Sequence, residues 1–164
     1  MVAYDPAGWH DFCMSVAGAS GALLGLAFVA ISFNLDAILE SEQLPGRAIG
    51  TLVFFAYPLG GSLLIELPGI SRTALGIGQG VLAAGLIALA TADLRRWSGH
   101  AGEPLSWRLT HLAPDLLVAT LASVGTFAVL TASIGGLYWI AGAMTIATTS
   151  GLVNSWVLLV EIKR

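Results

Sequence analysis

The stretch that decides the fold covers residues 116–160, LLVATLASVGTFAVLTASIGGLYWIAGAMTIATTSGLVNSWVLLV, and contains no charged residue. Its 45 residues are about twice the number that one helix needs to cross the ~30 Å hydrocarbon core of a bilayer. The run must therefore fold back on itself, and Gly135 and Gly136 mark the turn, because paired glycines tolerate turn dihedrals. Tyr138 and Trp139 beside them suit the membrane interface. We expect two membrane spans here, at residues 116–134 and 137–160.

Charged residues separate three further apolar segments earlier in the chain. An ionised side chain at the bilayer centre costs roughly 2.5 to 3.5 kcal/mol, so the gaps between charges mark spans. The gaps predict spans at residues 12–35, 48–65 and 73–92. Pro58 predicts a kink in the second span, since proline lacks an N–H and clashes with the preceding turn. The polar residues 93–115 are predicted to form a loop outside the membrane, with Asp115 at a helix start.

The composition excludes an ordinary soluble domain. Of the 164 residues, 56% are hydrophobic and 10% are charged, and the mean hydropathy is +0.83. Soluble domains carry about 25% charged residues, so this chain has too few to cover a surface that faces water. We predict an all-α, polytopic transmembrane helix bundle of about five spans, formed by residues 1–164 as a single domain. A bundle of four spans is the alternative.

The basic residues predict the orientation, because Lys and Arg near span ends are retained in the cytoplasm. With five spans, only Arg72 falls on one side. The other side carries Arg47, Arg95, Arg96, Arg108, Lys163 and Arg164. We expect the N-terminus outside the cell, and the loop 93–115 and the C-terminus in the cytoplasm. Four spans would place the Arg95 and Lys163 regions on opposite sides, which this rule disfavours.

Small residues at four-residue spacing predict the faces by which the helices pack. Helices in lipid associate through small residues that let backbones approach closely. Such spacing occurs in three of the predicted spans, and the residues concerned are Gly21, Gly25, Gly76, Gly80, Ala147 and Gly151. Two interpretations remain open. These faces either make contacts within one chain or join copies of the chain into a homo-oligomer.

A few polar residues in or beside the spans are candidates for a polar path or for contacts between helices. They are His10, Asp11, Ser32, Asn34, Glu66 and Asn154. Amide groups in hydrocarbon need partners, so these side chains either bind other helices or line a hydrated path. Glu66 follows the kinked span and borders a Pro and Gly turn, which makes it a candidate for proton or cation coupling. The pair His10 and Asp11 either relays protons or anchors the interface.

Motifs of catalysis and of nucleic-acid binding are absent from the sequence. It has no phosphate-binding loop, no paired histidines at metal-binding spacing and no nucleophile elbow. The few basic residues form no patch, which excludes nucleic acid as a partner. The single cysteine, Cys13, excludes a disulfide within the chain and a site of several thiolates. We expect no catalytic residues, no cofactor and no metal, and we expect that the protein is not an enzyme.

The first span resembles a known group of proteins. The segments 9–12 (WHDF), 17–26 (AGASGALLGL) and 28–35 (FVAISFNL) are similar to small uncharacterised bacterial multi-span inner membrane proteins. Some members of this group are labelled modulators of the FtsH protease. The resemblance implies a protein of the bacterial inner (plasma) membrane.

These observations lead to two hypotheses of function. The first is a small noncatalytic integral membrane protein that assembles with itself or binds and modulates another membrane complex. The second is a channel or transporter subunit for a small ion or solute. The lipid bilayer is the expected surrounding in both.

Overall fold

The computed structural model describes residues 5–41, 44–98 and 105–162, in which all regular structure is helical. This confirms the all-α prediction. The described part of the chain forms a short 3-10 helix, η2 (Pro6–Trp9), and six α-helices. These are α1 (His10–Phe33), α2 (Leu35–Glu40), α3 (Leu44–Ile65), α4 (Arg72–Ser98), α5 (Leu105–Thr131) and α6 (Leu137–Ile162).

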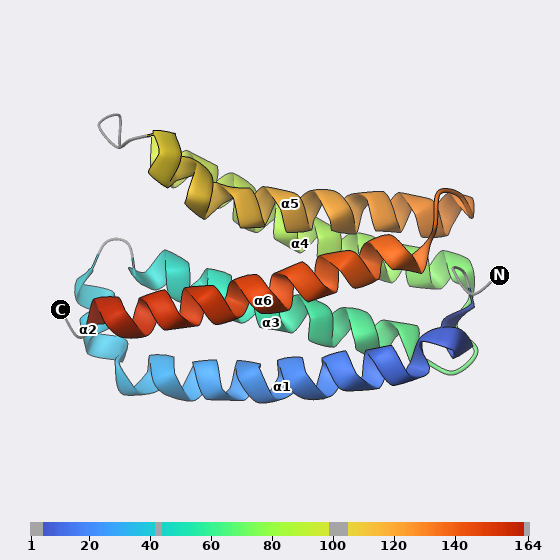
Figure 1. Cartoon of the computed structure of the whole chain (residues 1–164), viewed down its shortest axis with the longest axis horizontal. Coiled ribbons are helices and arrows are strands. Elements are labelled where there is room, and N and C mark those ends of the chain that lie inside the picture. The colour runs from blue at the N-terminus through green and yellow to red at the C-terminus, as the bar shows by residue number, and fades with distance from the viewer. Residues whose placement is uncertain (1–4, 42–43, 99–104, 163–164) are drawn as a thin grey trace.

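The five long helices run up and down along one axis (Figure 1). One end of the bundle holds the start of α1 and the turns from α3 to α4 and from α5 to α6. We call it the His10 end. The opposite end holds α2 and the end of α6, and we call it the Asn34 end. The first and the last long helix therefore have their outer termini at opposite ends of the bundle.

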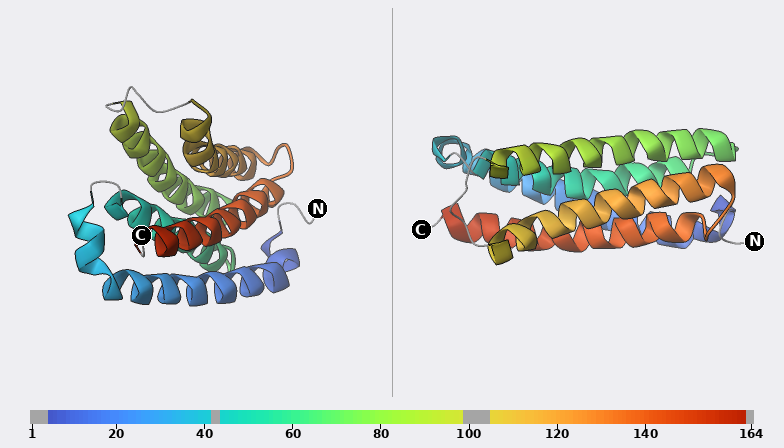
Figure 2. Two further views of the ribbon diagram at one scale, coloured as in Figure 1. Left: turned by 60° about the vertical axis from the view of Figure 1, so that its left-hand side comes forward. Right: turned by 90° about the horizontal axis from the view of Figure 1, so that it is seen from above.

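The helices α3 and α6 form the middle of the bundle, with α1 on one side and α4 and α5 on the other (Figure 2). α1 packs mainly on α3, and α4 packs mainly on α5. The core between the helices contains large side chains such as Phe54, Tyr57, Ile140 and Met144, all buried. α1 thus lies at the edge of the bundle, with one face in contact and most of its surface outward.

Four helices of the described residues are long and apolar enough to cross a membrane. They cover Pro6–Phe33, Leu44–Ile65, Arg72–Arg95 and Leu112–Thr131, with mean hydropathies between 1.7 and 2.0. The predicted fifth span corresponds to α6, which is 26 residues long. α6 is also rich in apolar side chains, with threonines, Ser150 and Asn154 among them. The chain is a membrane-spanning helix bundle, and both the five-span and the four-span layouts fit it.

The predicted turn between the last two long helices is confirmed. Gly135 and Gly136 have φ angles of 96° and 48° and lie between α5 and α6. Two residues with side chains, Ala132 (φ 52°) and Ile134 (φ 44°), also adopt positive φ there. The backbone carbonyl of Ile134 accepts a hydrogen bond from the indole N–H of Trp139. The aromatic residue beside the glycines thus fixes the turn as well as suiting the interface.

The structure differs from the sequence prediction over residues 93–115. The predicted loop is helical at both sides, because α4 continues to Ser98 and α5 begins at Leu105. Residues 99–104 lie outside the described part. Asp115 is consequently inside α5 and does not start it. The physical reason is that charged residues end an apolar span but do not end a helix, since Leu and Arg are good helix formers in either solvent.

The ends of α1 and α3 also depart from the predicted ranges. α1 stops at Phe33, because Asn34 leaves helical geometry with φ −116° and ψ 21°, and the short α2 follows. α3 starts at Leu44, before the predicted residue 48, and runs through Pro58 to Ile65. Pro58 cannot donate to the carbonyl of Phe54 four residues earlier. The backbone carbonyl of Phe54 in α3 therefore receives no hydrogen bond from the residue four positions later in its own helix.

Candidate functional site

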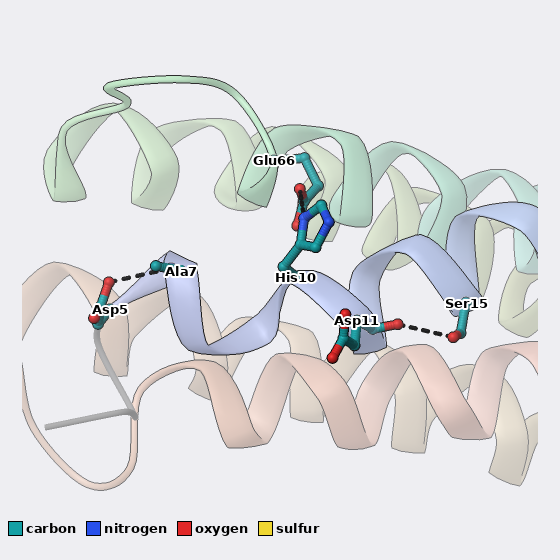
Figure 3. A network of polar contacts seen from close by, with 6 residues as sticks. All are labelled: Asp5, Ala7, His10, Asp11, Ser15 and Glu66. Atoms are coloured by element: carbon teal, nitrogen blue, oxygen red, sulfur yellow. Dashed lines mark hydrogen bonds and ion pairs between the residues drawn. The ribbon is translucent and has the colours of Figure 1, made fainter.

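A polar contact joins α1 to the turn after α3 at the His10 end of the bundle. His10 is the first residue of α1, and Glu66 directly follows α3. The Nδ1 atom of His10 lies 2.7 Å from Oε2 of Glu66, and the two side chains are 61% and 23% exposed (Figure 3). The contact joins the edge helix α1 to the turn between α3 and α4. It unites two residues that the sequence analysis considered separately.

Local interactions hold the start of α1 in this position. The carboxylate of Asp5 accepts a hydrogen bond from the N–H of Ala7 at 3.1 Å and caps η2. Trp9 is buried and stacks edge-on against Tyr138 of α6, with 4.7 Å between ring centroids, and against Phe12, at 5.9 Å. These contacts anchor the N-terminal turn to α6 while His10 points toward Glu66.

Asp11 does not join this contact. Successive helix residues point in different directions, and Asp11 is directed away from Glu66 in Figure 3. Its backbone carbonyl accepts a hydrogen bond from Oγ of Ser15 at 2.8 Å. The partner of the His10 side chain is therefore Glu66, in the turn that follows α3.

The environment of His10 favours its charged form. His10 lies in the first turns of the candidate helix Pro6–Phe33, before its uncharged run, which begins at Phe12, so the side chain is at the end of this helix and not in its apolar stretch. The hydrogen bond to Glu66, and then the attraction of the Glu66 charge, raise the pKa of His10 above its usual value, against a small opposing effect of desolvation. The more distant charge of Asp11 acts in the same direction.

A buried polar cluster lies directly below the His10 and Glu66 pair. We use this name for Cys13, Ser62, Gln79 and Met144, which come from α1, α3, α4 and α6 and are all fully buried. Cys13 follows His10 by three residues, and Ser62 precedes Glu66 by four, so both point the same way as the surface pair. Within the cluster, Oγ of Ser62 donates to Sδ of Met144 at 3.8 Å.

Gln79 reaches this cluster from α4. Its Nε2 donates to the backbone carbonyl of Gly61 at 3.1 Å, while its Oε1 has no partner among the described residues. A Cβ atom at Gly61 would lie 2.5 Å from Cε of Met144 and 3.4 Å from Oε1 of Gln79. Glycine at this position is what allows the two side chains to come so close to α3.

Two further buried polar atoms lack a partner among the described residues. They are Oγ of Ser20 on α1 and Oη of Tyr57 on α3. A polar atom buried without a partner costs roughly 1 to 3 kcal/mol, so such atoms in a native protein need an explanation. Ser20 and Tyr57 could not be predicted from the sequence, because a single Ser or Tyr in an apolar segment carries no signal of burial. Only Gln79 stands out in sequence, as an amide in the middle of an apolar run.

The other polar candidates lie at the opposite end. Ser32 and Asn34 bond back to their own helix, to the carbonyls of Phe28 and Ala30, each at 2.8 Å. Asn154 is half-buried near the end of α6. Asn34 therefore lies at the opposite end of the bundle from Glu66, and Asn154 lies within α6, eight residues before its end.

The small-residue faces differ in what they contact. A Cβ atom at Gly76 or Gly80 of α4 would meet Leu130 or Thr126 of α5, and one at Gly151 would meet Phe55. Ala147 is fully buried in α6. Gly21 faces Leu59, but a Cβ atom at Gly25 would meet nothing within 4 Å. Most of these positions thus serve contacts within the chain, and Gly25 lines an open apolar groove between α1 and α3.

A second polar contact that the sequence did not indicate links α4 and α5. Asp115 of α5, which is buried, lies close enough to Asp93 of α4 for the two carboxyl groups to interact. The sequence gives no sign of this contact, because the contact depends on how α4 and α5 pack against each other.

Comparison of the chain with protein-family models, with curated proteins and with solved structures finds no match. The class that the structure defines is an all-α, membrane-spanning helix bundle with a surface ion pair above a buried polar cluster.

Proposed function

We propose that the protein is a small noncatalytic membrane protein that assembles laterally through the outward face of α1. The observation that carries this proposal is the exposure of α1. In its most apolar stretch, 11% of the residues are buried within the protein, compared with 56% in α3. Yet α1 is the most apolar of the four helices, with a mean hydropathy of 2.0.

The composition of the outward face favours a protein partner over lipid alone. Gly18, Ala22 and Gly25 lie on one exposed face of α1, at spacings of four and three residues, and we call them the outer stripe. A Cβ atom at Gly18 or Gly25 would meet nothing within 4 Å. Small residues that are not used within the chain let a second helix approach the backbone closely, which is how helices associate in lipid.

The partner in this proposal is a second copy of the chain or another membrane complex. The resemblance of the first span to proteins labelled modulators of the FtsH protease supports a bacterial inner membrane setting and a membrane protease as one such complex. The face that would make the contact belongs to the same helix that carries the resemblance.

For the orientation we propose that the N-terminus lies outside and the C-terminus in the cytoplasm. In support, Arg47 at the start of α3 and Arg95 near the end of α4 lie at the Asn34 end, while Arg72 lies at the His10 end. Basic residues favour the cytoplasm, so the Asn34 end faces inward. Reporter tags at the two termini would fall on opposite sides of the membrane with five spans and on the same side with four.

Crosslinking tests the assembly. In a Cys13→Ala background, Ala22→Cys places a thiol in the outer stripe, and Ala84→Cys places one on the exposed surface of α4 as the matched control. We expect oxidation in native membranes to join Ala22→Cys chains to each other or to a second membrane protein, and to leave Ala84→Cys chains single. Absence of any product from Ala22→Cys, or equal products from both variants, would refute the proposal.

The second candidate function is a path for an ion or small solute, and one observation favours it. Buried polar atoms without described partners occur on three neighbouring helices, at Ser20, Tyr57 and Gln79. A path needs polar groups at several depths. Flux into liposomes tests this, and the path fails as a function if purified protein moves no ions, or if Glu66→Gln and Asn154→Ala leave the flux unchanged.

A further inference from the structure

A cavity of about 140 Å³ lies between α1, α3 and α6, in the half of the bundle nearer the Asn34 end. Apart from Thr51 and Ser155, all the residues that line it are apolar. An engineered cavity of ~150 Å³ with an apolar lining stays dry and binds small apolar molecules. The cavity of this protein is thus suited to part of an apolar ligand and not to water.

The two hydroxyl groups in the lining are already engaged within their own helices. Oγ1 of Thr51 donates to the backbone carbonyl of Arg47 at 2.9 Å, and Oγ of Ser155 donates to the carbonyl of Gly151 at 2.8 Å. Neither O–H group is therefore left to hold a ligand. A molecule in the cavity is bound by apolar contact, which has no directional requirement.

The cavity exists because a large side chain of α3 turns toward α6 while α1 offers small ones. Phe55 is 1% exposed and rests on α6, since a Cβ atom at Gly151 would lie 2.7 Å from its Cε1. On α1 the lining includes Ala27 and Ala30, whose side chains are too short to fill the space. An empty cavity destabilises a protein in proportion to its volume, so an apolar occupant would stabilise the bundle.

The cavity is closed toward the Asn34 end and open at its side. Ile31 and Leu158 line it and also pack with Ile38 of α2, which is buried, so α2 covers that end. Leu26 of α1 and Leu152 of α6 line it too, but they are 68% and 47% exposed. Both helices pack on α3 and contact each other little. The opening therefore lies between α1 and α6 and faces the surroundings of the bundle, which are hydrocarbon.

The depth of the cavity matches one leaflet of a bilayer. Its lining on α1 runs from Leu23 to Ile31, a rise of ~12 Å, and α1 ends two residues later at Phe33. One leaflet supplies about half of the ~30 Å hydrocarbon core. The molecules that fill this depth beside the opening are the acyl chains of the leaflet at the Asn34 end.

We infer that the cavity between α1, α3 and α6 binds a segment of an acyl chain of a membrane lipid. The chain enters sideways between Leu26 and Leu152 and lies against Phe55, and the headgroup stays outside the bundle. Each methylene group that is buried contributes about fourfold to the affinity. The inference is independent of the proposed assembly, because Ala27 and Ala30 lie on another face of α1 than the outer stripe.

Photolabelling of the full chain in vesicles tests the inference. The probe is a phosphatidylcholine with a photoreactive diazirine in one acyl chain, and mass spectrometry identifies the labelled residues. Phe54 and Phe55 are neighbours in α3 and are both 1% exposed, but only Phe55 lines the cavity. We expect adducts on Phe55 and none above background on Phe54. The exposed Leu26 is the positive control.

Variants that fill the cavity provide the second arm. Ala30→Leu takes the space of two or three methylene groups, so it should reduce the labelling of Phe55 by at least about tenfold. Ala22→Leu places the same side chain in the outer stripe and should leave this labelling unchanged, even where it disrupts assembly. Circular dichroism reports whether each variant is folded.

Two results would overturn the inference. One is the absence of adducts on Phe55 when Leu26 is labelled, which is also the result expected if a side chain of a second protein occupies the cavity. The other is undiminished labelling of Phe55 in folded Ala30→Leu, or in Ala27→Leu where the first variant is unfolded.

Discussion

His10 and Glu66 are 56 residues apart in sequence, and their side chains meet at 2.7 Å at the mouth of the bundle. This contact raises the pKa of His10, chiefly through the hydrogen bond and then through the charge of Glu66. A raised pKa in the folded state means that folding favours the protonated ring. The stabilisation is therefore complete below the pKa of an unfolded histidine, about 6.5, and is lost as the pH rises through the raised value.

We predict that Glu66→Gln lowers the pKa of His10 toward its usual value. Nuclear magnetic resonance of the histidine rings, titrated in detergent micelles, measures this directly. Asp11→Asn is the control, because the charge of Asp11 contributes least to the shift and its removal should lower the pKa less. An unchanged His10 titration in Glu66→Gln would show that the two side chains do not meet in solution.

The same pair predicts how the stability depends on pH. The difference in melting temperature between the natural chain and His10→Asn should be largest near pH 6, where the ring is protonated. It should shrink toward pH 9. The effect is at most a few degrees because the pair is exposed to solvent. A difference that grows with rising pH would contradict the pairing.

Gly61 gives a test of packing around the buried polar cluster. A methyl group there would lie 2.5 Å from Cε of Met144 and 3.4 Å from Oε1 of Gln79, so something must shift. Because Cε is the end of a flexible methionine side chain and alanine is the better helix former, we predict that Gly61→Ala lowers the free energy of unfolding by at most about 1 kcal/mol. Gly50→Ala on the same helix is the matched control.

A Cβ atom at Gly50 would meet nothing within 4 Å, although the residue is buried. Alanine is a better helix former than glycine, so Gly50→Ala should be neutral or stabilise by up to about 1 kcal/mol. Denaturation in mixed detergent micelles, followed by circular dichroism, measures both variants. Equal effects at the two positions would mean that α4 and α6 do not approach α3 as described.

The layout of the helices was predictable because hydrocarbon imposes a simple rule. Charged residues lie between spans, so the positions of the charges and of the paired glycines were enough to predict two spans in residues 116–160 with a turn at Gly135. The rule says nothing about where a helix stops in water. For that reason the helical extensions of α4 to Ser98 and of α5 back to Leu105 were missed.

The candidate site was predictable only in its parts. His10 and Glu66 were each recognised as polar residues at span boundaries, but their pairing depends on how α1 docks on α3, which no local pattern encodes. Asn34 and Asn154 were candidates because they are amides in or beside apolar spans. The side chain of Asn34, however, donates its hydrogen bond to the carbonyl of Ala30 in its own helix. Cys13, Ser62 and Met144 are unremarkable in sequence and become a cluster only when three helices meet around them.

Gln79 gives a prediction about the cost of a buried amide. Its Oε1 has no partner among the described residues, and its one bond is to a carbonyl that already belongs to α3. Replacing it by a methionine of similar shape removes a desolvated acceptor together with one hydrogen bond. We therefore expect Gln79→Met to change the free energy of unfolding by less than about 1 kcal/mol.

Gln79→Glu is the contrasting variant, since it has the same shape and introduces a charge into the core. Burial of a charge costs several kcal/mol, so this variant should be strongly destabilised or should bind a proton. Denaturation in mixed micelles at neutral and acidic pH distinguishes the two results. A loss above about 2 kcal/mol in Gln79→Met would mean that Oε1 has a strong partner in the folded state.

The turn between α5 and α6 predicts two effects of opposite sign. Gly135 has a φ of 96°, which a residue with a side chain adopts at a cost of about 1 to 2 kcal/mol, so Gly135→Ala should destabilise the protein. Ala132 already bears such a cost at a φ of 52°, and Ala132→Gly should relieve it. The greater freedom of glycine in the unfolded chain offsets about 0.5 to 1 kcal/mol of that gain. Thermal unfolding should therefore rank Ala132→Gly at or above the natural chain and Gly135→Ala clearly below it, and a reversed order would show that the turn has another conformation.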